Sequence, residues 1–110
     1  MKPGSDDVQV ACSLSVPELR ERETALLARF RSSVIETEEL PNGYSFRGPG
    51  DGKWIAIVAE LIAVERVCCP FLTFELAAQP NLGPVIVRVF GPSGAKDFVR
   101  TILCKPDGSA

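Results

Sequence analysis

The chain has 110 residues, 45% hydrophobic and 24% charged, with a net charge of −2 and a pI of about 5.1. These values predict one globular domain over residues 1–110, with 1–7 and 105–110 frayed. The absence of a dense basic patch argues against nucleic-acid binding, and no apolar run is long enough to span a membrane.

The first predicted elements are a strand and a helix. Val8–Leu14 alternates apolar and polar residues with the period of a half-buried strand. Ser15-Val16-Pro17-Glu18 has the pattern of a capping box, so a helix is expected from there to about Ser32. The charged run Glu18–Glu23 in its first turns is interpreted as a solvated face.

A β-hairpin is predicted next. Val34–Glu38 and Tyr44–Arg47 have strand character, and Pro41-Asn42-Gly43 between them is a turn signal. Asn and Gly tolerate the positive φ angles that tight hairpins use, which favours a turn at this point.

The second helix is expected from Lys53 to about Cys68, with Asp51 as its N-cap. An apolar stripe predicts one strongly buried face, formed by Trp54, Ile57, Leu61, Val64 and Cys68 and widened by Ile55, Val58 and Ile62. Pro70 cannot continue a helix and disfavours helical geometry at Cys69, so the helix must end near the cysteine pair.

Two more strands and a helix complete the chain. Phe71–Ala78 and Val85–Phe90 are predicted strands, and a last helix is expected from about Gly94 to Leu103, with Ser93 as its N-cap. The order β-α-β-β-α-β-β-α predicts an α+β fold, with an antiparallel or mixed sheet and helices packed on it.

Four cysteines are present, Cys12, Cys68, Cys69 and Cys104, and there is no histidine. The polar segment Met1–Asp7 lacks the apolar core of a secretory signal, so we expect a cytoplasmic protein with reduced thiols. The lack of histidine excludes Ser-His-Asp and Cys-His catalysis and every metal site that contains histidine.

The vicinal pair Cys68-Cys69 is the strongest chemical feature of the sequence. Glu65 lies three and four residues before the two cysteines, so it shares their surface of the helix. Thiolates are preferred by soft ions, such as Cu(I), Hg(II) and As(III). Adjacent cysteines do not have the spacing of a CxxC zinc site, which makes Zn(II) a less favoured candidate.

The position of the pair at a helix C-terminus affects its reactivity. The partial negative charge there raises a thiol pKa, although Arg66 would compensate if it folded over the sulfurs. A metal displaces the thiol proton itself, so metal ligation is favoured over a reactive nucleophile. Cys12 would supply a third sulfur if its strand lies against the end of the second helix.

Four segments resemble a family of small uncharacterised bacterial proteins. The central one, Glu65–Leu76, contains an ERxCCPF-type motif, and Gly91–Lys96 contains a GPxGAK-type motif; the others are Ala11–Leu14 and Leu40–Tyr44. The resemblance implies a shared fold and singles out Cys12, Glu65, Cys68 and Cys69 without supplying a mechanism.

The sequence therefore predicts binding of a soft metal or metalloid ion through Cys68 and Cys69, with Cys12 and Glu65 as further ligands. One alternative is a thiol redox enzyme in which one cysteine of the pair attacks and the other resolves. Another is a small interaction or ligand-binding domain whose cysteines only fill the core. The ion, any protein partner and the oligomeric state are left open.

Overall fold

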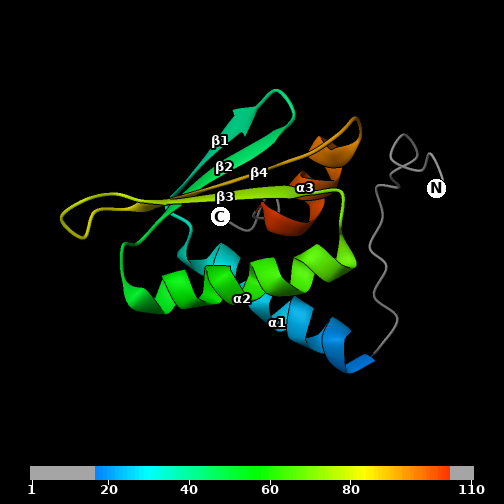
Figure 1. Cartoon of the computed structure of the whole chain (residues 1–110), viewed down its shortest axis with the longest axis horizontal. Coiled ribbons are helices and arrows are strands. Elements are labelled where there is room, and N and C mark those ends of the chain that lie inside the picture. Colours follow the sequence, from blue (N-terminus) through cyan, green and yellow to red (C-terminus); the bar gives the residue numbers. More distant parts are fainter. Residues whose placement is uncertain (1–16, 105–110) are drawn as a thin grey trace, which may run out of the picture.

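The computed structural model of the protein describes residues 17–104 (Figure 1). The elements are α1 (Pro17–Ser33), β1 (Glu36–Leu40), β2 (Gly43–Gly48), α2 (Gly52–Cys68), β3 (Thr73–Ala78), β4 (Val85–Phe90) and α3 (Ala95–Leu103). The strand predicted at Val8–Leu14 lies outside the described residues. None of the described helices is long and apolar enough to cross a membrane.

Within these residues four strands form one sheet in the order β1-β2-β4-β3, and every neighbouring pair is antiparallel. The predicted α+β class is confirmed, and the sheet that these four strands form is antiparallel. Tyr44 and Phe46 of β2 stand opposite Val89 and Val87 of β4, and all four are buried. Alternation along the strands therefore defines one buried sheet face.

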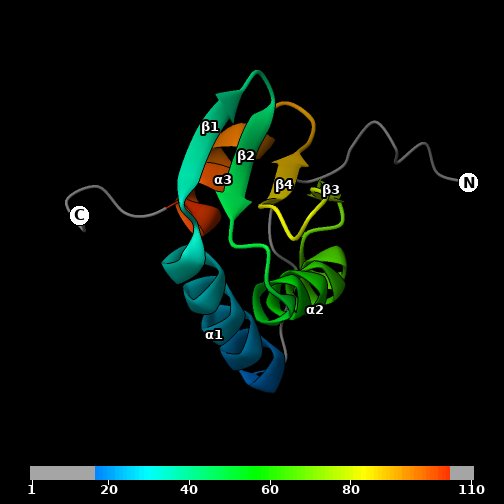
Figure 2. The ribbon, with the colours of Figure 1, turned by 90° about the vertical axis from the view of Figure 1, so that its left-hand side faces the viewer.

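The helices cover that face (Figures 1 and 2). α1 and α2 lie side by side, and α3 packs against β2 and β4. Three aromatic side chains join the layers: the ring of Phe30 lies 5.2 Å from that of Phe46 and 5.4 Å from that of Trp54, between centroids. The opposite sheet face carries the Arg47–Glu36 and Arg88–Glu75 ion pairs, at 3.0 and 3.2 Å.

The first hairpin differs in detail from the prediction. β1 begins at Glu36, two residues late, because Val34 packs into the core and its amide still donates to the Arg31 carbonyl of α1 at 3.3 Å. Among the described residues positive φ occurs only at Asn81, Leu82 and Gly94, so the turn at Asn42 forms without it. Gly43 is required for space, since a Cβ there would lie 2.0 Å from the carbonyl oxygen of Val89.

Of the two predicted N-caps at Asp51 and Ser93, one is confirmed and the other is wrong. Asp51 caps α2 as predicted, and its side chain accepts a hydrogen bond of 2.8 Å from the Trp54 amide. The prediction of Ser93 as the cap of α3 was wrong. Gly94 occupies that position with φ of 94°, a left-handed conformation that favours glycine over serine.

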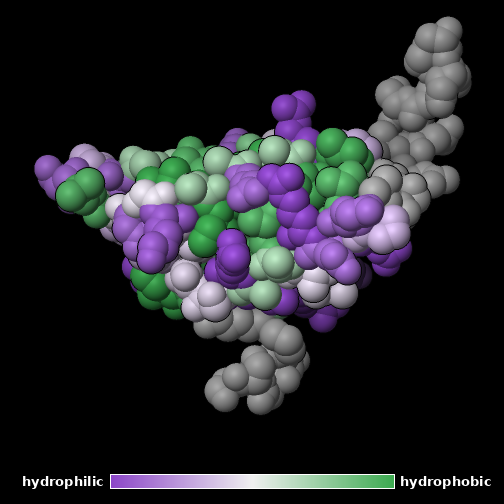
Figure 3. Space-filling model, turned by 90° about the horizontal axis from the view of Figure 1, so that it is seen from below, coloured by the Kyte–Doolittle hydropathy of each residue, from purple (hydrophilic) through white to green (hydrophobic). Residues whose placement is uncertain are grey.

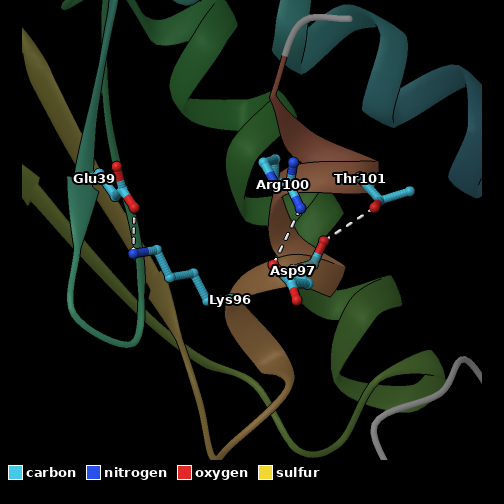
Figure 4. Close-up of polar contacts among 5 residues, drawn as sticks. All are labelled: Glu39, Lys96, Asp97, Arg100 and Thr101. Atoms are coloured by element: carbon cyan, nitrogen blue, oxygen red, sulfur yellow. Dashed lines mark hydrogen bonds and ion pairs between the residues drawn. The ribbon is translucent and has the colours of Figure 1, made fainter.

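α3 is also tied to the sheet through Lys96. Its ammonium forms an ion pair with Glu39 of β1 (Figure 4) and lies 5.9 Å from the centre of the Tyr44 ring. The next residue, Asp97, instead accepts a hydrogen bond of 3.1 Å from the Arg100 guanidinium within the helix. The lysine of the GPxGAK-type segment is thus engaged in holding α3 to the edge strand.

Candidate functional site

Glu65 is the most unusual buried residue of the described chain. It lies inside the apolar stripe of α2, four residues after Leu61 and three before Cys68, and its side chain is 0% exposed. Within residues 17–104 neither of its carboxylate oxygens has a hydrogen-bond partner. Buried polar groups are almost always paired, so an unpaired carboxyl group needs an explanation.

The end of α2 brings both cysteines next to Glu65. Spacings of three and four residues place Cys68 and Cys69 on the same side of the helix as Glu65. The Cys69 amide still donates to the Glu65 carbonyl at 2.6 Å, so the last turn extends through this residue before Pro70. The Leu72 amide then donates to the Cys69 carbonyl at 3.1 Å, which turns the chain into β3.

A fourth residue, Glu23, approaches from α1. It is partly exposed, whereas Glu65, Cys68 and Cys69 are buried. The ligand atoms of these four residues all lie within 4.8 Å of one another, and we call this group the thiol–carboxylate cluster. A solvent-exposed ion pair between Arg22 and Glu60 also links α1 to α2.

The two sulfurs are in different states. Cys69 carries a free thiol that donates a 3.4 Å hydrogen bond to the Sγ of Cys68, whereas Cys68 takes part in a disulfide bond. The disulfide differs from the expectation of four reduced thiols. Both side chains are 0% exposed, although Cys69 lies at the C-cap of α2 and outside its helical stripe.

Burial controls the ionisation of the cluster. It raises the pKa of Glu65 from 4.5 to about 8, and the adjacent carboxyl of Glu23 contributes in the same direction. Burial likewise raises the pKa of the Cys69 thiol far above its usual range, and the neighbouring carboxyl group of Glu65 adds to this. At neutral pH Glu65 and the Cys69 thiol therefore hold their protons unless a cation takes their place.

The structure brings together only some of the site residues that the sequence predicts. Glu65, Cys68 and Cys69 come together, while Cys12 lies outside the described residues. Arg66 is exposed, and the pKa of Cys69 is raised by burial and by the neighbouring Glu65 and Glu23, with no opposing effect from Arg66. Cys104 lies apart from the described cluster, half-buried against the core, and burial raises its pKa despite the opposing effect of Arg100.

Sequence reasoning missed Glu23, which it assigned to a solvated face. The signal was nonetheless present, because Glu23 falls four residues after Leu19 and three before Leu26 in the apolar stripe of α1. An acidic residue within such a stripe marks a position that packing will partly bury. The interpretation of Glu18–Glu23 as one solvated run obscured this.

The surface beside the cluster is mixed in character. Leu19, Arg22, Ala63, Val64 and Val67 line a hollow of about 210 Å³ between α1 and α2. Viewed from the side of these helices, hydrophobic and hydrophilic residues are interspersed (Figure 3). The outer surface of the two helices that carry the cluster is therefore neither uniformly hydrophobic nor uniformly polar.

No protein-family model, curated protein or solved structure matches this chain. The thiol–carboxylate cluster is therefore the feature of the described residues that points to a function.

Proposed function

We propose that the protein, with Cys68 reduced, binds a soft or borderline metal ion at the thiol–carboxylate cluster. The observation that supports this proposal is the position of Glu65. Its carboxyl group is fully buried beside two sulfurs, and its oxygens have no hydrogen-bond partner among residues 17–104. Cys68 and Cys69 provide the thiolates, and Glu65 and Glu23 provide the oxygens.

A bound cation would resolve the electrostatic problem of the cluster. An unpaired buried charge is strongly unfavourable, so Glu65 keeps its proton in the metal-free protein. A metal ion would replace the protons of Glu65 and of the thiols, and it would satisfy the oxygens and sulfurs together. The raised pKa of Cys69 is no obstacle, because the metal itself displaces the proton.

The core-filler alternative explains the cysteines but not the carboxylate. Cys68 and Cys69 are buried with the apolar core, as small hydrophobic side chains often are. Core packing alone gives no reason for a glutamate at a position where leucine would fit the stripe. Two acidic residues beside the same pair of sulfurs favour a ligand role.

One observation favours thiol–disulfide exchange as a second candidate function: the free thiol of Cys69 lies 3.4 Å from Sγ of Cys68, which is already in a disulfide. Attack by a Cys69 thiolate would form a Cys68–Cys69 bond and expel the former partner as a thiolate. Adjacent Cα atoms are ~3.8 Å apart, closer than the usual disulfide range, so the product would be strained. Burial also disfavours the attacking thiolate.

Equilibrium dialysis and native mass spectrometry with Zn²⁺ test the metal proposal. The protein is first reduced with a phosphine and desalted. We expect one ion per chain, and Cys69→Ser and Glu65→Gln should each weaken binding at least about tenfold. Cys104→Ser is the matched control, since Cys104 also carries a free thiol but lies outside the described cluster.

Circular dichroism verifies that each variant is folded, and Glu65→Gln keeps the shape of the side chain. Unchanged binding in both folded site variants would contradict the proposal. Rapid alkylation of Cys69 near neutral pH, without metal binding, would favour the exchange reaction instead.

A further inference from the structure

We infer that the ion is divalent and four-coordinate, of the Zn(II) class, and that Glu23 closes the site as its exchangeable ligand. This inference rests on the proposed function and names the ion that the cluster selects. It revises the sequence-based preference for Cu(I), Hg(II) or As(III), which rested on the spacing of the cysteines and not on where their sulfurs lie.

The distance between the sulfurs argues against linear coordination. Two thiolates on opposite sides of one ion, with bonds of ~2.3 Å, would place their sulfurs ~4.6 Å apart. In the structure, where Cys68 is in a disulfide, the Sγ atoms of Cys68 and Cys69 are 3.4 Å apart, and reduction leaves both residues at the same helix end. Tetrahedral angles with the same bonds give ~3.5–4 Å, which the pair reaches with a small outward movement.

The composition of the cluster argues for a borderline ion. Within the described residues it offers two sulfurs and two carboxylates, whereas purely soft ions favour sulfur alone. Zn(II) accepts both donor types and takes four ligands in tetrahedral geometry. Fully deprotonated, two thiolates and two carboxylates carry four negative charges, which a divalent ion neutralises better than a monovalent one.

The unequal burial of the four ligands suggests how the ion exchanges. Glu65, Cys68 and Cys69 come from one rigid helix end and are buried, so they form a fixed three-atom face. Glu23 belongs to α1 and is partly exposed. It is the ligand that can leave without disturbing α2, and its binding would join α1 to α2 through the ion.

Competition experiments on the reduced protein test the ion class. Zn²⁺, Cu(I) and arsenite are offered at equal free concentration, and Co²⁺ is used separately as a spectroscopic probe. We expect Zn²⁺ to be retained over the other two, and Co²⁺ to give the visible bands of a tetrahedral site with sulfur-to-metal charge transfer. Preferential binding of Cu(I) or arsenite, or an octahedral Co²⁺ spectrum, would overturn the inference while leaving metal binding intact. Binding of none of these ions would instead refute the proposed function.

The role of Glu23 has its own control on the same helix. Glu23→Gln should weaken Zn²⁺ binding about tenfold and speed its release to a chelator, while the sulfur-to-metal bands of bound Co²⁺ remain. Glu21→Gln removes the same charge from an exposed position of α1. It should leave the Zn²⁺ affinity and the rate of Zn²⁺ release unchanged. Equal effects of the two substitutions would show that Glu23 acts only through general charge. Loss of Zn²⁺ binding in Cys12→Ser would show that the sulfur of Cys12, and not Glu23, is the fourth ligand. That result would overturn the role inferred for Glu23.

Discussion

The two ends of α2 are equally buried but chemically opposite. At its start Trp54 is 1% exposed, stacks on Phe30, and donates from its indole nitrogen to the Phe30 carbonyl at 3.4 Å. At its end Glu65 is 0% exposed, yet its oxygens have no partner in the described part of the chain. Burial alone therefore does not distinguish core from site, whereas the pairing of buried polar atoms does.

This difference suggests separate roles for the two ends. The aromatic end joins α1, α2 and the sheet through apolar area, and its one polar side-chain atom is satisfied. The acidic end lowers the stability of the metal-free protein unless Glu65 is protonated. Natural proteins retain such unfavourable arrangements chiefly at functional sites, which is why we place the metal there.

The largest expected effect is at the aromatic end. Trp54→Ala should lower the free energy of unfolding by about 3–5 kcal/mol, because it removes a fully buried aromatic side chain and leaves a cavity. Urea denaturation measures this change. Lys53→Ala, an exposed neighbour on the same helix, should stay within about 0.5 kcal/mol.

The Trp54 substitution also tests whether the two ends of α2 are independent. The fraction of Trp54→Ala that remains folded should still bind one Zn²⁺ per chain, since the cluster lies at the other end of the helix. Loss of binding by folded protein would mean that the aromatic packing sets the cluster geometry and that the two ends are not independent.

An intermediate effect is expected from Glu65→Gln in the metal-free protein. The folded pKa of Glu65, about 8, lies above its unfolded value of 4.5, so the folded state binds the extra proton between these values. The contribution of Glu65 to stability is therefore fully present below pH 4.5 and is lost as the pH rises to 8. At about 1.4 kcal/mol per pKa unit, the loss amounts to a few kcal/mol.

The neutral amide of Glu65→Gln resembles the protonated acid. Relative to wild type, this variant should gain stability between pH 5 and pH 8 by a few kcal/mol, as measured by urea denaturation at each pH with a chelator present. Glu21→Gln, at an exposed site, provides the baseline. A constant difference between Glu65→Gln and wild type over this range would mean that Glu65 is ionised in the folded protein.

Local sequence rules predicted most of the fold. Asp51 as a cap and Val85–Phe90 as a strand follow from hydrogen-bonding capacity and alternation within a few residues, and both are confirmed. The start of β1 and the cap of α3 were misplaced, because core packing of Val34 and the left-handed turn at Gly94 override local preference.

The candidate site was only partly predictable for a related reason. The helical spacing of Glu65, Cys68 and Cys69 can be read from the sequence, so their proximity was foreseeable. The approach of Glu23 depends on how α1 packs on α2, and the 3.4 Å separation of the sulfurs depends on the backbone at Cys69, with φ −128° and ψ 71°. Neither is fixed by the spacing of residues in one segment.

The smallest effect is expected at the solvent-exposed polar contact between α3 and β1. Lys96→Ala removes the ion pair with Glu39 and the contact with Tyr44, but the two charged side chains are 31% and 64% exposed. Water screens such pairs, so the loss in unfolding free energy should be about 1 kcal/mol or less, and smaller at high salt. A double-mutant cycle with Glu39→Ala isolates the coupling, with Zn²⁺ binding expected to be unchanged. A coupling of several kcal/mol would contradict the expected screening and show that this exposed contact contributes substantially to the stability of the fold.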